Sequence, residues 1–239
     1  MPNDFYNISD LNIKERAESF VLFVRDIPLL TPEKNEITSS NRGLIEFIIQ
    51  DFKELRVERF EVSDGVLIEP RVLSVFQLYA SQVDYIAPGA GPTLEEYHQW
   101  LSEDPVLADV PPAGVCGPVE RYLVSLGLAL VPQSSPGGQR LLNNLVDICR
   151  SLTPEKQSVV VNLSQKFHMN VLFPMALVDG FCSTDDFAVG ISASVDEYRA
   201  FFDPSSGADQ LPALADITNL IKAVRGDADA CLKYLKFYS

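Results

Sequence analysis

Apolar residues recur at the spacing of an α-helix through most of this 239-residue chain. Recurrence at every third or fourth position predicts helices that bury one face and expose the other. The pattern is clearest in a segment whose apolar face consists of Leu44, Ile45, Ile48, Phe52 and Leu55. Three carboxylates of the same segment are expected to point outward: Glu46, Asp51 and Glu54. Residues 119–239 follow this period almost without interruption, which favours helices packed on helices.

Capping residues predict where several helices begin and end. Asp10 is a suitable N-cap for a helix over 10–25, and three further starts are marked by Thr93 with Glu96, Thr153 with Pro154, and Ser183 with Asp186. The last long helix is expected over 211–225. Gly226 would end it, because glycine is the usual residue after a helix C-terminus.

One segment has the period of a β-strand instead. Between 56 and 69 apolar and polar residues alternate, and Ser63-Asp64-Gly65 supplies a turn. The predicted fold class is therefore mainly α: a helical bundle or irregular helical array with one small β-hairpin in the N-terminal half.

A stretch rich in proline and glycine at 104–118 suggests a division of the chain, because few regular elements tolerate that composition. We expect an acidic N-terminal subdomain of helices and the hairpin over 1–103. The stretch 104–118 would connect it to a helical C-terminal subdomain over 119–239.

The net charge of −14 is the most unusual property of the composition. Residues 1–110 hold 20 acidic and 9 basic side chains, whereas 111–239 hold 13 and 10. Nucleic acids and anionic membranes attract lysine and arginine, so a direct contact with either is disfavoured. A protein partner, and a basic one in particular, is compatible with this charge. The candidate interaction surface consists of Glu46, Asp51, Glu54, Glu95, Glu96 and Trp100.

The four cysteines are far apart and form no CxxC pair, which favours buried thiols in a reducing compartment, the cytoplasm. The polar start, 1–10, does not have the pattern of a secretory signal, and no segment has the roughly 20 apolar residues of a membrane span. Cys116, Cys149 and Cys182 are spaced at 33 residues, a length typical of helical repeats, but no repeat consensus accompanies them.

Motifs for catalysis, metals or cofactors are missing from the sequence. The two histidines, His98 and His168, have no neighbouring ligands at metal-site spacing, and a pair of His168 with Cys182 would need the fold to assemble it. The loop at 137–140 carries a cation ahead of a helix but lacks a phosphate-binding pattern. The acidic pairs Glu95-Glu96 and Asp185-Asp186 are expected in first helical turns, where the helix dipole favours them.

These observations favour a non-enzymatic protein-protein interaction protein, such as an adaptor, a regulator or an acidic inhibitor of a basic partner. No cofactor is expected. The alternative is an enzyme or a small-ligand-binding protein whose site is assembled from scattered residues. The sequence favours the first because no catalytic pattern stands out.

Overall fold

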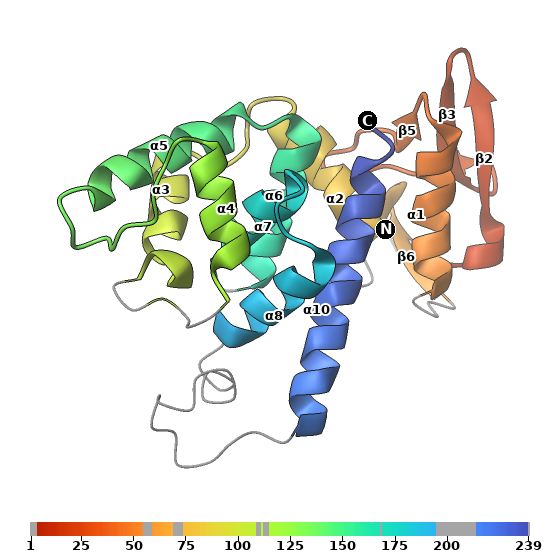
Figure 1. The fold of residues 1–239 in the computed structure, drawn as a ribbon. Coiled ribbons are helices and arrows are strands. Elements are labelled where there is room, and N and C mark those ends of the chain that lie inside the picture. The colour runs from red at the N-terminus through yellow and green to blue at the C-terminus, as the bar shows by residue number, and fades with distance from the viewer. Residues whose placement is uncertain are drawn as a thin grey trace. The chain divides into compact units, whose positions relative to one another are not determined.

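The computed structural model describes residues 4–54, 59–68, 74–108, 111, 115–167, 169–194 and 214–238. Its chain forms two compact units, one of Met1–Gly91 with Lys233–Ser239 and one of Pro92–Leu232 (Figure 1). The fold is mainly α, and two small sheets lie in the first unit. The prediction of a single hairpin is therefore corrected, while the helical character is confirmed.

The first sheet replaces the helix expected over 10–25. Strands β2 (Leu11–Arg16) and β3 (Ser19–Val24) pair antiparallel, and β4 (Ile27–Pro28) and β5 (Thr38–Ser39) pair with β3. Every side chain from Val21 to Val24 is buried, so both faces of β3 are covered. A continuous run of β-branched and aromatic residues suits such a strand, and periodicity alone does not separate it from a buried helix.

The second sheet contains the predicted hairpin and one more strand. β6 (Arg59–Ser63) and β7 (Val66–Ile68) pair antiparallel around a turn in which Asp64 and Gly65 both have positive φ, 51° and 84°. This is the backbone that a two-residue hairpin turn requires. β1 (Asp4–Asn7) adds to β6 and gives the strand order β1-β6-β7. A third strand stabilises a hairpin that would be marginal by itself.

The helices of the first unit are α1 (Arg42–Glu54), α2 (Val75–Ala80) and a turn of π-helix, η2 (Ser81–Ile86). Four residues of the predicted apolar face of α1 are buried, Leu44, Ile45, Ile48 and Phe52, whereas Leu55 lies outside the described residues. The Phe52 ring lies 6.3 Å from that of Phe76 on α2. Asp84 of η2 is also buried. Its carboxylate accepts hydrogen bonds from the Thr31 hydroxyl at 2.5 Å and the Asn35 amide at 2.8 Å, which fixes the turn after β4.

The described residues of the second unit form helices joined by loops. Its elements are α3 (Leu94–Ser102), η3 (Pro105–Leu107), α4 (Gly117–Ser125), α5 (Gly138–Ser151), α6 (Pro154–Lys166), α7 (Leu172–Val178) and α8 (Thr184–Ser194). Every residue of α7 is buried, and α7 packs against α4, α6 and α8. The Phe173 ring occupies the space beside Gly190, so that a Cβ at this position would overlap the ring. Glycine at 190 therefore permits this close packing of α7 on α8.

The last helix, α10 (Leu214–Leu235), continues through the expected stop at Gly226. A glycine inside a helix costs about 1 kcal/mol relative to alanine. Burial of Val224, Ala228 and Cys231 on one face of α10 outweighs this cost. The predicted end of the last long helix at Gly226 was wrong for this reason.

A buried carboxylate holds two helix starts of the second unit together. Asp104, which is 1% exposed, accepts hydrogen bonds from the backbone N–H groups of Val106 at 2.8 Å, Val171 at 2.6 Å and Leu172 at 2.9 Å. These donors lie at the starts of η3 and α7, which have no helical acceptors of their own. Burial raises the Asp104 pKa to about 6, although the three N–H groups act in the opposite direction.

The stretch 104–118, expected to connect two subdomains, falls inside the unit Pro92–Leu232. The division at that stretch stays a prediction. Among the described helices, none combines the length and the apolar character needed to cross a bilayer.

Candidate functional site

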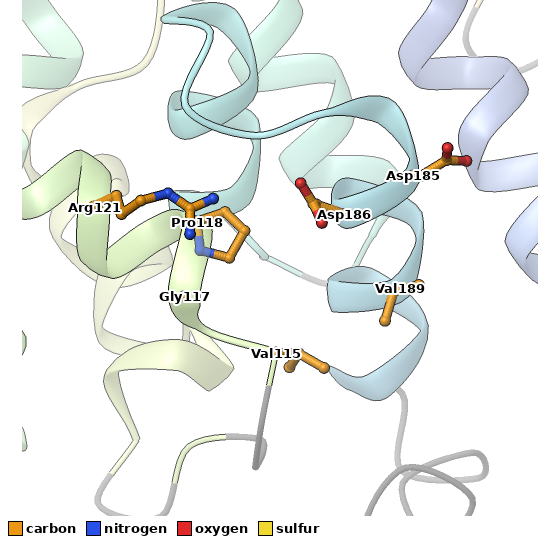
Figure 2. A pocket seen from close by; sticks show the side chains of 7 residues that line it. All are labelled: Val115, Gly117, Pro118, Arg121, Asp185, Asp186 and Val189. Atoms are coloured by element: carbon orange, nitrogen blue, oxygen red, sulfur yellow. The ribbon is translucent and has the colours of Figure 1, made fainter.

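A pocket of about 350 Å³ opens between α4 and α8 in the second unit (Figure 2). It is lined by Val115, Gly117, Pro118, Arg121, Asp185, Asp186 and Val189. Valine and proline side chains give it apolar walls, and three charged residues stand at its edges. The pocket lies between the N-terminal ends of both helices.

The α4 wall follows directly from how that helix begins. Pro118 occupies the first turn, where its fixed φ suits a helix and its missing N–H costs nothing. Cys116 is the N-cap and makes no side-chain capping hydrogen bond. One turn later, Arg121 is exposed, and its Nη1 lies 3.6 Å from the position of a Cβ on Gly117. The guanidinium is thus held over the uncapped start of α4.

The α8 wall carries two carboxylates, and both are engaged by other residues. Asp186 accepts a hydrogen bond from the Ser183 hydroxyl at 2.8 Å, while the Asp186 N–H donates to that hydroxyl at 3.0 Å. Asp185 forms an ion pair with Arg225 at 3.0 Å. Figure 2 shows Asp186 and Arg121 pointing toward each other from opposite walls, and Asp185 turned away. The expected first-turn role of this acidic pair is confirmed.

The chemistry of these side chains suits binding. No lining residue is a serine, cysteine or histidine, so the pocket lacks a nucleophile with an adjacent base. A search of the described residues finds no group of three histidine, cysteine or acidic side chains that could hold a metal ion. Apolar walls with charged groups at the edge can instead receive a side chain of a binding partner.

An exposed apolar surface continues from the pocket along α4. Val124 is 71% exposed and lies three positions after Arg121, which places the two on the same side of the helix. Leu126, the C-cap of α4, is 38% exposed but lies about 140° around the helix from Arg121, on another side. We call the pocket together with Val124 the α4 surface.

The predicted interaction residues are not brought together. Glu46 and Asp51 lie in the first unit, whereas Glu95, Glu96 and Trp100 lie in the second, and the side chain of Glu54 is outside the described part. As an interaction surface, this set stays a prediction.

Two of the predicted residues are buried, contrary to the expectation for a surface. Asp51 is 6% exposed because its carboxylate accepts a hydrogen bond from the Val75 N–H at 3.0 Å, at the start of α2. Trp100 is 8% exposed, and its ring lies 5.6 Å from that of Tyr97.

The other members of the set are exposed. Glu46 pairs with Arg42 at 2.8 Å, and Glu95 is in the first turn of α3. Glu96 forms the predicted capping box with Thr93. Each of these positions supports its own helix, as first-turn or i, i+4 charges do.

The residues considered for catalysis do not form a site in the described structure. The His98 Nε2 lies 2.9 Å from the Gln139 Nε2, a polar contact between α3 and α5. His168, and with it the pair of His168 and Cys182, lies outside the described residues. Of the segment 137–140, Gly137 is the N-cap of α5 and the other residues are its first turn, and none of them lines the pocket.

The two structural units divide the acidic excess differently from a cut of the sequence at residue 110. Residues 92–232 hold 18 acidic and 8 basic side chains, a net charge of −10, and the rest of the chain has −4. In the first unit, four carboxylates are neutralised by neighbouring cations, in the pairs Lys14–Asp26, Arg16–Glu36, Arg25–Asp10 and Arg42–Glu46. The negative charge is therefore greater in the helical second unit.

Comparison with known proteins adds a likeness of fold. No protein-family model and no curated protein matches the sequence. Two solved structures match: Atp12 from Paracoccus denitrificans, and a point mutant of the same protein. Each superposes with a TM-score of 0.60 and 15% identity over 96% of both chains. The fold is similar to that of Atp12. At this identity the likeness to Atp12 concerns the fold alone.

Sequence reasoning missed Arg121. The Pro118 start of α4 and the Ser183–Asp186 cap of α8 were both readable as local patterns. Nothing in either pattern indicates that the two helix starts face one another. The sequence therefore gave no reason to select Arg121 as a residue of a site.

Proposed function

We propose that this chain is a non-enzymatic assembly chaperone that binds a subunit of the F1 part of an ATP synthase. The observation that carries this proposal is the likeness of fold to Atp12 over 96% of both chains. Atp12 is an assembly factor that binds an F1 subunit. A chaperone of this kind needs a surface for another protein and no catalytic residues.

The α4 surface supports the proposal from the chemistry of its side chains. It offers a pocket with charged groups at its edge and an exposed aliphatic side chain, but no nucleophile and base. An unassembled subunit exposes apolar surface that its own assembly later buries, and a chaperone must cover such surface reversibly.

The charge of the chain supports a partner whose contact surface is mainly positive. A net charge of −14 accelerates association with a cationic surface, and salt screens this effect. We also propose that the protein works in the cytoplasm. The four cysteines are all buried thiols, a state that a reducing compartment maintains.

The test uses the purified full chain with each F1 subunit in turn, analysed by size-exclusion chromatography at low and high salt. We expect a complex with one isolated subunit that weakens as salt is raised. Assembled F1 is the control and should not bind, because an assembly factor leaves the finished complex. Failure of every isolated subunit to bind would overturn the proposal.

A further inference from the structure

We propose that residues 128–132, in the connection between α4 and α5 (Figure 1), form an edge to which an extended, mainly apolar strand of the protein partner adds through backbone hydrogen bonds. This inference rests on the proposed function, because it names the part of the partner that the chain recognises. The contact is made by the backbone of this segment, and the α4–α5 pocket takes no part in it.

The composition of this connection leaves its edge unprotected. Residues 124–132 contain no charged side chain, although the chain as a whole is rich in charges. Strands that lie at the edge of a sheet usually carry charges, which keep other chains from pairing with them. The edge strand β2 is an example, because its residues 14–16 are all charged. The connection after α4 has no such protection.

The segment is extended and is fixed at both ends. The chain runs through 128–132 without a turn or a bend. At the start, the Leu128 N–H donates to the Leu123 carbonyl at 2.9 Å and Gly127 has a φ of 71°, an arrangement that closes many helices. At the other end, the Gln133 side-chain amide donates to two carbonyls at the end of α3, at 3.3 and 2.8 Å. A segment held in this way is ordered before a partner binds, which lowers the entropic cost of binding.

The backbone between the two fixed ends is unpaired. Neither the N–H nor the C=O of Ala129 or Val131 forms a hydrogen bond with any described residue. In an extended chain both groups of one residue point to the same edge, and alternate residues share that edge. Leu128 uses the other edge for its bond to Leu123, so Ala129 and Val131 form the free one. A second strand pairs with these two donors and two acceptors at once, whereas a single side chain cannot.

The side chains of the segment define the composition of the incoming strand. Leu128, Leu130 and Val131 are half-buried, and Ala129 is exposed. Apolar side chains on neighbouring strands stabilise each other, so the centre of the incoming strand is apolar.

The charge of the chain decides between a strand of another protein and a second copy of this one. Two copies, each with a net charge of −14, repel each other. A strand with basic residues at its ends is attracted instead. The occupant is therefore a strand of another protein, apolar at its centre and basic at its ends.

The test titrates the blocked peptide acetyl-Lys-Val-Thr-Val-Lys-amide into the isotopically labelled full chain and follows binding by NMR. The control is the same peptide N-methylated at its three central residues, which keeps the side chains and the charge but removes backbone donors. We expect the control to bind about tenfold more weakly, because hydrogen bonds between the strands are lost. The amide signals of Ala129 and Val131 should shift, and their hydrogen exchange should slow when the unmodified peptide binds.

Ala129→Pro removes one N–H from the edge and should abolish the difference between the two peptides. Ala129→Ser is the matched control, because it changes the same exposed side chain and keeps the N–H. It should distinguish the peptides as the wild type does. An unchanged melting temperature verifies that each variant is folded, and the N-methylated peptide tests the wild type independently of any substitution.

Four results would each overturn the inference. They are equal binding of the two peptides, no binding of either, shifts confined to residues outside 128–132, and an unaffected Ala129→Pro variant. Shifts of the Ala129 and Val131 amides that depend on protein concentration without peptide would also overturn it, because a second copy would then occupy the edge.

The two proposals fail separately. If an F1 subunit binds the wild type and Ala129→Pro equally, and the peptides are not distinguished, the edge is not the recognition site but the chaperone function stands. If the peptides are distinguished and no F1 subunit binds, the edge stands and the F1 partner is wrong.

Discussion

The buried carboxylate of Asp104 gives the sharpest stability prediction, for the change Asp104→Ala. The substitution leaves three backbone N–H groups without their acceptor, those of Val106, Val171 and Leu172. Each unsatisfied buried donor costs about 2 kcal/mol, which gives about 6 kcal/mol in all.

One effect opposes this loss. Burial raises the Asp104 pKa from 3.8 to about 6 even though the three N–H groups lower it, so the charged form is held inside at a net cost that alanine avoids. The change is still destabilising, because alanine offers the three buried N–H groups no acceptor. We therefore expect Asp104→Ala to lower the free energy of unfolding by about 3 kcal/mol at pH 7.

The raised pKa of Asp104 also makes the stability of the protein depend on pH. The direction of the pKa shift gives the sign of this dependence. The folded state has the higher pKa for Asp104, so between pH 4 and pH 6 it binds more protons than the unfolded state. The contribution of Asp104 to stability is therefore present at low pH and is lost as pH rises through about 6. From pH 7 to pH 5 the wild type should gain about 1.3 kcal/mol that Asp104→Ala does not gain.

Urea denaturation of both proteins at pH 7 and pH 5 measures these differences, and all other titrating groups cancel in the comparison. Asp147→Ala is the matched control, an exposed carboxylate of the same unit whose loss should cost less than about 0.5 kcal/mol. The reasoning is refuted if Asp104→Ala is as stable as the wild type. It is also refuted if the gap narrows at pH 5, because the N–H groups would then outweigh burial and lower the pKa.

Three further predictions concern the interior. Gly190→Ala should destabilise the protein by about 2 kcal/mol, because the added methyl group overlaps the Phe173 ring. Gly226→Ala should stabilise it by about 1 kcal/mol, because the space around this helical position is open. A thermal unfolding experiment that ranks the two variants in the opposite order would contradict the packing described. Asp51→Ala should lower the free energy of unfolding by about 2 kcal/mol, and Glu46→Ala should lower it by less than about 0.5 kcal/mol, because only Asp51 is buried. Urea titrations measure both values, and equal values would mean that Asp51 is exposed. The four cysteines should react with a thiol reagent only on unfolding, because burial raises the Cys149 pKa to about 12; rapid labelling of the native chain would disprove this.

Short sequence patterns correctly predicted those elements that are stabilised by residues close together in the chain. The capping box of Thr93 and Glu96, the turn at Asp64-Gly65 and the apolar face of α1 each depend on residues a few positions apart. Such patterns predicted the mainly helical character and most helix starts of the second unit. They failed where a longer-range contact decides the structure, as in β3, whose consecutive apolar residues are buried on both faces by other parts of the chain.

The sequence by itself determined that this chain is acidic, mainly helical and without a catalytic motif. Only the tertiary structure decided which carboxylates are buried and which charged side chains line the pocket. Asp51 and Glu46 look alike in the sequence, yet Asp51 alone lies beside the N–H of another helix. Arg121 meets the start of α8 only after folding, because packing around α7 brings together two helix ends far apart in the chain. Side-chain chemistry is local, whereas burial and proximity are properties of the whole fold.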